Sequence, residues 1–294
     1  MYRFRAVLAA ISLVVPASAL AQLAPGAATD TASIRIAYGA SPEQYGELRL
    51  PTGSGPFPVA VVIHGGCFLA SMGTTQYVAA FADALRSAGI ATWNVEYRSV
   101  DSPSGGWPET FRDVGRAADH IRALARRYPL DTTRVVAVGH SAGGFLALWL
   151  GGRAALRPAA ALYASGPLPL RAAVALGADG DLPPIGPGLM AACKVPVADR
   201  LLGTDDRTQR ARRAQANPAD MPPSRVRQVL IAGDQDVFET PALRDAYVAR
   251  ARAKGEPVEV TVLPGAKHFD VIDPKALVWP TIRDTLLAIV KGSP

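Results

Sequence analysis

Hydrophobic residues fall in short runs along this chain, separated by longer amphipathic stretches. Two alternating segments, Ile34–Tyr38 and Tyr45–Leu50, predict a hairpin, and the unbroken apolar run Pro58–His64 is typical of a strand buried on both faces of a parallel sheet. The other expected strands are Ile90–Val95, Val135–Gly139, Ala159–Tyr163, Val229–Gly233 and Val258–Leu263. The expected helices are Gln76–Ser87, Pro108–Tyr128, Ala142–Gly151, Pro241–Lys254 and Trp279–Val290. This alternation predicts an α/β fold with a mostly parallel central sheet and helices on both faces.

The alternation stops between Ser165 and Pro223, where Pro, Gly and Arg are dense and no apolar period persists. A long irregular segment inside a compact domain is usually functional, so we expect residues 165–223 to form a lid or cap. A chain of 294 residues with 49% hydrophobic content can bury a substantial core. We therefore expect residues 34–294 to form a single domain carrying this insertion.

The N-terminus has the pattern of a secretory signal peptide. Arg3 and Arg5 precede the apolar run Ala6–Val15, and Ala19-Leu20-Ala21 supplies an A-x-A cleavage site before Gln22. The apolar run is shorter than the roughly 20 residues that a membrane span needs, which makes a retained anchor the weaker alternative. We expect a signal peptide over residues 1–21, a flexible lead-in over 22–33, and a mature chain exported to the periplasm or secreted without membrane attachment.

The formal net charge of +6 raises the question of a nucleic-acid partner. The basic residues mostly do not cluster, and the densest run, Arg207–Arg213, has no interleaved aromatic residue. This run is typical of a solvated helix face, so we expect no nucleic-acid binding.

The chain has two cysteines, Cys67 and Cys193. In an exported protein an even pair is a disulfide candidate. Two buried thiols are the alternative, because the sequence does not give their separation in space.

The most specific motif is Gly139-His140-Ser141-Ala142-Gly143-Gly144, a G-x-S-x-G between an expected strand and an expected helix. A nucleophilic serine on a strand-to-helix turn needs small neighbours, because the backbone there is sharply bent and closely packed. We therefore predict that Ser141 is a catalytic nucleophile.

A serine hydroxyl becomes a good nucleophile only when a base removes its proton and an acid orients that base. Of the four histidines, His120 is expected on an exposed helix face, His140 lies beside the serine, and His64 ends a strand. His268, in the loop after the strand Val258–Leu263, is therefore the expected base.

The orienting acid should follow a strand between the serine and the histidine in the chain. The loop after Val229–Gly233 contains both Asp234 and Asp236. We expect Asp236 to be the acid and keep Asp234 in reserve, because an early loop Asp often accepts hydrogen bonds from its own backbone. Asp270 and Asp273 are expected to be surface or helix-capping acids.

Backbone N–H groups should stabilise the oxyanion that forms when the serine attacks a carbonyl. One expected donor is Ala142, directly after the nucleophile. The others are expected in the glycine-rich loop after the third strand, His64-Gly65-Gly66-Cys67.

These motifs together resemble the α/β-hydrolase superfamily, and within it the esterase branch with an HGG oxyanion motif, which includes carboxylesterases, feruloyl-esterase-like proteins and kynurenine formamidases. The resemblance covers Tyr45 to the C-terminus. It rests on His64–Gly66, Asn94–Arg98, Gly105–Pro108, Asp113–Val114, Gly139–Gly144, Gly233–Asp236 and Gly265–His268. It implies the triad Ser141, Asp236 and His268, and backbone donors at Gly66, Cys67 and Ala142. It also implies a structural ion pair between Arg98 and Asp113.

One departure from the carboxylesterases of this branch that are similar to the hormone-sensitive lipase group is Cys67, which stands where they have a third glycine. This favours the formamidase and feruloyl-esterase-like members. The expected function is hydrolysis of a small carboxylic ester or related acyl substrate through an acyl-serine, without a metal or other cofactor. An amide, arylformamide or peptide hydrolase with the same triad is the alternative, and a catalytically inactive binding protein with this fold is a third. The sequence leaves the oligomeric state open.

Overall fold

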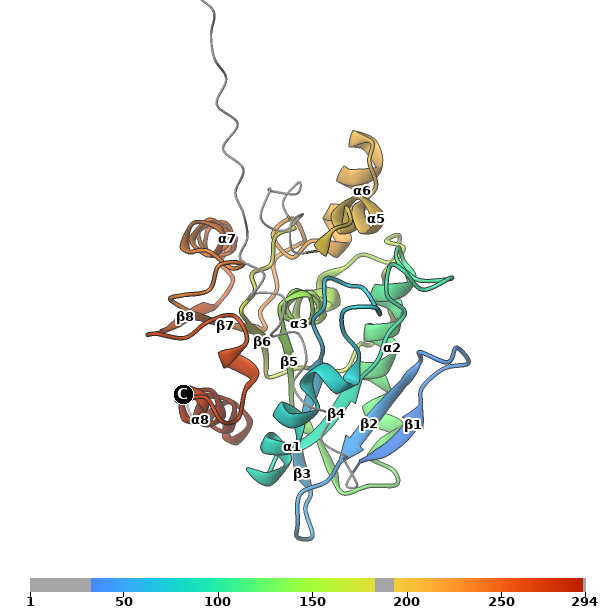
Figure 1. Cartoon of the computed structure of the whole chain (residues 1–294). Helices are drawn as coiled ribbons and strands as arrows, with labels where there is room; N and C mark the ends of the chain where they lie inside the picture. Colours follow the sequence, from blue (N-terminus) through green and yellow to red (C-terminus); the bar gives the residue numbers. More distant parts are fainter. Residues whose placement is uncertain (1–32, 183–192, 293–294) are drawn as a thin grey trace, which may run out of the picture.

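A computed structural model of the chain describes residues 33–182 and 193–292, and these residues build one eight-stranded sheet (Figure 1). The strand order is β1-β2-β4-β3-β5-β6-β7-β8. The strands are β1 (Ile34–Ala37), β2 (Tyr45–Arg49), β3 (Phe57–Ile63), β4 (Ala91–Val95), β5 (Leu130–His140), β6 (Ala172–Leu176), β7 (Arg227–Gly233) and β8 (Val258–Leu263). The pairs β1/β2 and β2/β4 are antiparallel and all other pairs are parallel. The predicted fold class, a mostly parallel sheet with helices on both faces, is confirmed.

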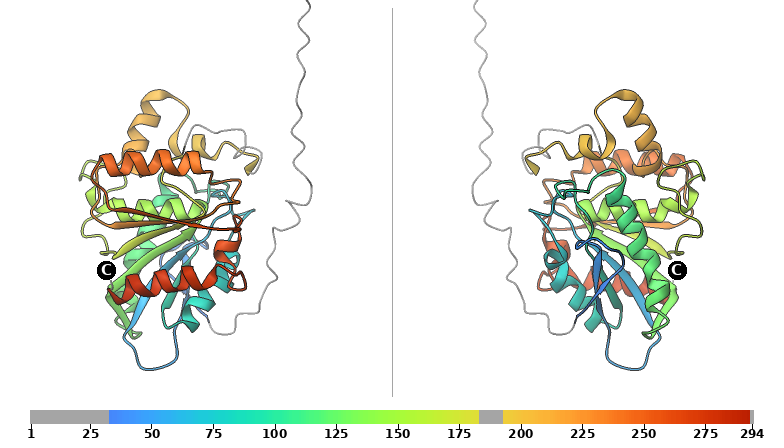
Figure 2. Two further views of the ribbon diagram at one scale, coloured as in Figure 1. Left: turned by 90° about the vertical axis from the view of Figure 1, so that its left-hand side faces the viewer. Right: turned by 90° about the vertical axis from the view of Figure 1, so that its right-hand side faces the viewer.

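Helices cover both faces because successive residues of the central strands point to opposite sides. In β3, Val59, Val61 and Ile63 pack with the helices α2 (Glu109–Leu124) and α3 (Ala142–Gly152). Ala60 and Val62 pack instead with α1 (Ala79–Ser87) and α8 (Trp279–Lys291). A smaller cluster joins α7 (Pro241–Ala253) to the face of β6 that α3 also covers. Figure 2 shows α7 and α8 on opposite sides of the sheet. Short 3-10 helices occur at Thr75–Val78, Arg153–Ala155 and Asp270–Ile272.

One predicted strand is wrong. Residues 159–163 form turns, closed by hydrogen bonds from Ala160 N–H to the Arg157 carbonyl and from Tyr163 N–H to the Ala160 carbonyl. The sixth strand is β6, the sequence AAVAL, whose alanines give little β-propensity signal. Small side chains suit this strand because α3 lies directly on it: a Cβ added to Gly144 would come within 3.4 Å of the Ala175 Cα. Close packing, which sequence patterns do not reveal, therefore decides the position of β6.

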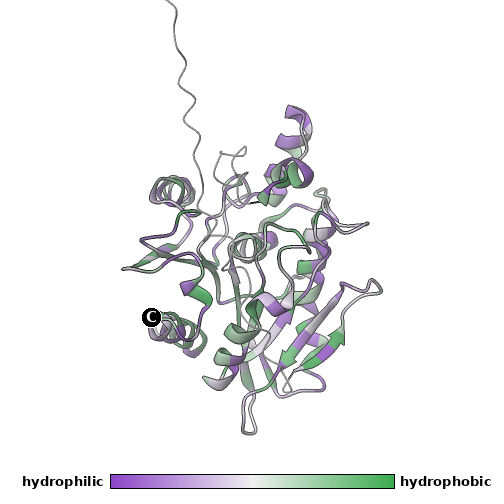
Figure 3. Ribbon diagram, viewed as in Figure 1, coloured by the Kyte–Doolittle hydropathy of each residue, from purple (hydrophilic) through white to green (hydrophobic). Residues whose placement is uncertain are grey.

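This strand also corrects the predicted insertion, because residues 165–223 are not uniformly irregular. They contain β6 and two helices, α5 (Val197–Leu202) and α6 (Asp206–Ala216), while residues 183–192 lie outside the described part of the chain. In α5, Val197, Leu201 and Leu202 join the core, whereas in α6 only Ala216 is buried. Figure 3 shows the hydrophilic character of α6, in keeping with the solvated helix face expected for Arg207–Arg213.

The predicted signal peptide, residues 1–21, lies outside the described residues, as does nearly all of the expected lead-in. Within 33–182 and 193–292, none of the helices has the length and apolar content needed to cross a bilayer.

Candidate active site

Ser141 lies on the sharp turn between β5 and α3, with a backbone φ of 53° and ψ of −122°. A positive φ is unfavourable for any residue with a Cβ, so the fold must hold this residue in place. The flanking glycines allow the turn: a Cβ on Gly139 would lie 2.2 Å from the Gly143 carbonyl oxygen, and one on Gly143 would lie 2.1 Å from the Ile63 carbonyl oxygen. The spacing of the G-x-S-x-G motif is therefore a steric requirement of this strand–turn–helix junction.

His268 and Asp236 form a hydrogen-bonded pair in the loops after β8 and β7. The His268 Nδ1 lies 2.7 Å from the Asp236 Oδ2, and both residues are buried. The other carboxylate oxygen of Asp236 accepts the backbone N–H groups of Phe238 at 2.8 Å and Glu239 at 3.0 Å, which fixes its orientation. Because Nδ1–H donates to a carboxylate, the Nε2 of His268 is left as the basic nitrogen. Ser141 and His268 line the same pocket.

A further glycine adjoins this pair. Gly177 follows β6 with a φ of 57°, and a Cβ at this position would lie 3.0 Å from both the Asp236 Oδ2 and the His268 Nδ1. The carboxyl ends of β5, β6, β7 and β8 therefore bring the three predicted triad residues to one edge of the sheet.

Asp234, the reserve acid, has a different place. It is exposed, and its Oδ1 accepts the backbone N–H of Gly265 at 2.7 Å, in the loop that carries His268. Asp234 thus holds one loop against another and does not orient the imidazole. Asp270 and Asp273 accept the backbone N–H groups of Lys267 and Lys275, so each makes a local loop contact and neither caps a helix.

Sequence reasoning missed the role of His140. Its Nε2 lies 2.7 Å from the His268 carbonyl oxygen, and its Nδ1 lies 2.7 Å from the Tyr77 hydroxyl. The carbonyl can only accept, so Nε2 carries the proton and the tyrosine donates to Nδ1. Burial lowers the pKa of His140 well below its ordinary value, which keeps the ring neutral. The sequence around Ser141 does not indicate that the His140 side chain contacts the loop that carries His268.

The expected oxyanion loop follows β3 and has an unusual backbone. Gly66, Cys67 and Phe68 all have positive φ, at 96°, 55° and 58°. Among the described residues, the N–H groups of Gly66 and Cys67 donate to no protein acceptor. Ala142 is the first residue of α3, where a helix leaves its N–H groups without intrahelical partners. A Cβ on Gly65 would lie 3.2 Å from the Ser141 Cβ, so this loop packs directly on the nucleophile.

A buried ion pair supports the loop. His64 contacts the Glu96 carboxylate through Nε2 and the Gly65 carbonyl oxygen through Nδ1, both at 2.8 Å. Each partner can only accept, so both ring nitrogens carry protons. Burial opposes this charge, but Glu96 outweighs it and raises the pKa of His64. Tyr97 stacks on the ring with centroids 4.3 Å apart and donates to the His64 carbonyl at 3.0 Å.

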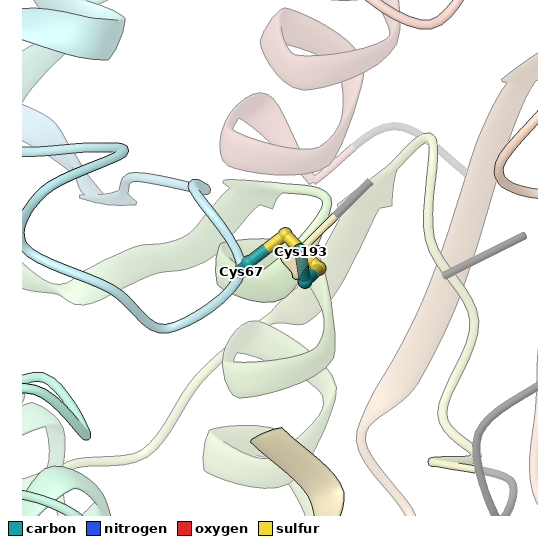
Figure 4. Close-up of a disulfide and its surroundings, with 2 residues drawn as sticks. All are labelled: Cys67 and Cys193. Atoms are coloured by element: carbon teal, nitrogen blue, oxygen red, sulfur yellow. A yellow bond between two sulfur atoms is a disulfide. The ribbon is translucent and has the colours of Figure 1, made fainter. Parts of the chain in front are cut away.

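A disulfide fixes the far side of the loop. Cys67 is joined to Cys193, 126 positions away in the sequence and just before α5 (Figure 4). Phe68 also accepts a hydrogen bond from the Val100 N–H at 2.8 Å through its backbone carbonyl. Two non-glycine residues with positive φ are therefore held from both sides. Cys67, which replaces the third glycine of the related motif, thus attaches this loop to Cys193 through the disulfide.

Outside the pocket, Arg98 and Asp113 form the ion pair that the resemblance implied, with Nε–Oδ2 at 2.7 Å and Nη2–Oδ1 at 2.8 Å. Asp113 is fully buried and accepts a further hydrogen bond from Gln44 at 2.6 Å. The expectation for His120 needs correction: its ring is half-buried and lies 6.1 Å from that of Trp93.

This sheet order, with a strained serine after β5 and a His–Asp pair after β8 and β7, defines the α/β-hydrolase fold. Residues 47–159 match the BD-FAE family, an esterase-like α/β-hydrolase domain, and no curated protein sequence matches the chain. The chain therefore has the α/β-hydrolase fold, and over residues 47–159 it resembles the esterase-like BD-FAE family.

Three solved structures illustrate the likeness. An inhibited esterase B from Lactobacillus rhamnosis has a TM-score of 0.75 and 18% identity, with 90% of this chain and 88% of that chain covered. A bacterial heroin esterase has a TM-score of 0.67 and 24% identity, with coverages of 94% and 90%. A bifunctional GH43-CE protein from Bacteroides eggerthii has a TM-score of 0.70 and 21% identity; the match covers 88% of this chain but 35% of that protein. At these identities the likeness establishes the fold.

Proposed function

We propose that this protein hydrolyses carboxylic esters through an acyl-serine intermediate. The observation that carries the proposal is the shared pocket of Ser141 and the His268–Asp236 pair, with the Gly65–Cys67 loop packed on the serine. The Ser141 Oγ attacks the ester carbonyl carbon while its proton passes to the His268 Nε2. The N–H groups of Gly66, Cys67 and Ala142 stabilise the oxyanion.

The tetrahedral intermediate then collapses. The bond between the carbonyl carbon and the leaving alcohol breaks, and the alcohol oxygen takes the proton from His268. In the second half, His268 removes a proton from water, whose oxygen attacks the acyl-serine. Return of that proton to the Ser141 oxygen releases the carboxylic acid and restores the enzyme. Asp236 keeps the imidazole in the required tautomer throughout.

Hydrolysis of p-nitrophenyl acetate and butyrate tests this function. The wild-type protein should release p-nitrophenol, Ser141→Ala should lose this activity, and the exposed Ser165→Ala should keep it. Undiminished activity in Ser141→Ala would remove the nucleophile assignment. Stronger turnover of an arylformamide than of either ester would redirect the assignment to amide chemistry. A wild-type protein that neither hydrolyses these substrates nor reacts with a fluorophosphonate would be a binding protein with a hydrolase fold.

We further propose that the chain works outside the cytoplasm. Two independent features support this: the signal-peptide pattern of residues 1–21 and the Cys67–Cys193 disulfide, a bond that persists in oxidising compartments. Expression of the full chain in a bacterial host, followed by fractionation and N-terminal sequencing, should yield an exported protein that begins at Gln22. An uncleaved product retained in the cytoplasm would contradict the proposal.

A further inference from the structure

The pocket beside Ser141 has an apolar side and an acidic side. Phe68, Phe145, Val197 and the disulfide contribute to the apolar lining. The acidic lining consists of Asp179, Asp181 and Glu239, none of which belongs to the triad. Hydrolysis of a simple ester does not require these three carboxyl groups. Whether each can bind a ligand depends on whether it already has a protein partner.

Asp181 is already engaged by protein cations. Its carboxylate contacts the Arg213 Nη2 and the Arg250 Nη1, both at 2.6 Å, and accepts a hydrogen bond from the Asn217 amide at 2.8 Å. This carboxylate is neutralised by the α6 and α7 arginines and serves as a structural tie.

Glu239 is different because one of its oxygens lacks a partner. The residue is 3% exposed, and its Oε2 lies 3.3 Å from the Arg244 Nη1. Its Oε1 is buried without any hydrogen-bond partner in the described structure. The backbone cannot move freely to relieve this, since the Glu239 N–H is held by the triad acid Asp236 at 3.0 Å. Glu239 lines the pocket, and a buried oxygen without a donor is costly until a ligand or another group supplies one.

Asp179 adds negative charge beside it. Its Oδ1 accepts the Asp181 N–H at 2.7 Å, and within residues 33–182 and 193–292 it forms no ion pair. Burial raises the pKa of Asp179 to about 6, and it raises that of Glu239 to about 8, with the Asp179 charge contributing to the latter. The two carboxyl groups therefore interact, and near neutral pH Asp179 remains mostly ionised.

We propose that Asp179 and Glu239 form a subsite for a hydrogen-bond-donating group of the ester substrate, a hydroxyl or an ammonium. The inference rests on the proposed esterase function, since it assigns the substrate class of the same pocket. A donor satisfies the unpartnered Glu239 oxygen, and an ammonium also offsets the Asp179 charge. A carboxylate at the same position is repelled by the Asp179 charge.

Two isosteric pairs of esters test the proposal on either side of the scissile bond. On the alcohol side, 2-(dimethylamino)ethyl butyrate is compared with 3-methylbutyl butyrate. On the acyl side, ethyl 3-(dimethylamino)propanoate is compared with ethyl 4-methylpentanoate. Within each pair the protonated nitrogen replaces a CH of the same shape. The glycerol monoester of butyrate supplies a hydroxyl donor, and the butyrate ester of glycolate supplies an anion.

In the wild-type protein, kcat/KM for the ammonium ester should exceed that for its isostere by about tenfold or more in at least one pair, as expected for a charge-assisted hydrogen bond. The glycerol ester shows whether a hydroxyl suffices, and the glycolate ester should be the poorest substrate. The ratio should fall toward one in Asp179→Asn with Glu239→Gln, and also partly in Asp179→Asn alone. Glu259→Gln, on the exposed side of β8, should keep the wild-type ratio.

Each ratio compares two substrates with the same protein sample. A variant that is partly unfolded therefore still gives the correct ratio, because both rates fall by the same factor. Ratios near one in both pairs of the wild-type protein would overturn the subsite, as would a tenfold ratio that persists in the double variant. Neither result affects the proposed function, which is tested separately by hydrolysis of the neutral esters.

Discussion

The ring of His140 donates a hydrogen bond from Nε2 to the backbone carbonyl of His268, at 2.7 Å. The residue before the proposed nucleophile thus holds the loop of the proposed base. Tyr77 fixes the tautomer of His140 from the other side, at 2.7 Å from Nδ1. Both histidines are buried, so this contact ties the loop of Ser141 to the loop of His268 inside the protein.

Removal of the His140 ring should therefore impair turnover more than substrate binding. We expect His140→Ala to lower kcat by about tenfold or more with a smaller change in KM, because a base displaced by a fraction of an ångström is poorly placed for proton transfer. His140→Gln, which retains a donor at a similar distance, should recover part of kcat. Equal losses in the two variants, or a loss confined to KM, would contradict a positioning role.

Asp236 and Asp234, both in the loop after β7, can be compared directly as the acid that orients His268. Asp236→Asn should reduce kcat by about 10⁴-fold, the loss seen when a triad acid no longer fixes the tautomer of its histidine. Asp234→Asn should leave kcat within a few-fold, because the Asp234 side chain is exposed and its carboxylate accepts the Gly265 N–H instead of contacting His268. Steady-state kinetics on p-nitrophenyl butyrate measure both, and a larger loss in Asp234→Asn would reverse the assignment.

Cleavage of the disulfide should affect both stability and activity. The bond closes a loop across 126 positions, and loss of a disulfide commonly lowers the free energy of unfolding by about 2–4 kcal/mol. It also releases the oxyanion loop at Cys67, so kcat should fall. Denaturant unfolding and ester hydrolysis of Cys67→Ala with Cys193→Ala measure the two effects. Full activity in this double variant would show that the loop holds its strained backbone without the bond.

Glu239 should make stability depend on pH. Burial raises its pKa to about 8, so the folded protein keeps a proton that the unfolded chain loses at lower pH. The stability associated with the neutral carboxyl is present below the unfolded pKa and is lost as the pH rises through about 8. Between about pH 5 and about pH 9, the thermal midpoint of the wild type should fall more than that of Glu239→Gln, which cannot ionise. Parallel pH profiles would show that Glu239 ionises normally.

Sequence patterns predicted the strands and helices whose own residues carry a clear hydrophobic period. The run before Ser141 and the helical segment after it predicted β5 and α3, and the order of the motifs predicted which loops meet at the carboxyl edge of the sheet. The strand β6 was missed because its sequence, AAVAL, has no pattern typical of a strand. Its alanines fit because α3 packs closely against this strand.

The contacts that surround the triad were less accessible to sequence reasoning. His140 and His268 are 128 positions apart, and nothing in either local sequence indicates their hydrogen bond. The sequence likewise does not indicate the environment of Glu239, whose Oε1 is buried without a hydrogen-bond partner in the described structure. The pairing of the two cysteines was one of two open possibilities, since sequence does not give the distance between Cys67 and Cys193.

The most direct test of the central claim is to locate the covalent adduct that a fluorophosphonate forms with the purified protein. The structure predicts a single adduct per chain, carried by the peptide that contains Ser141, and its loss in Ser141→Ala. The rate of labelling should also fall sharply in His268→Ala, because the imidazole no longer takes the serine proton. An active esterase whose adduct maps to any other residue, or which forms none, would contradict the assignment of Ser141 as the nucleophile.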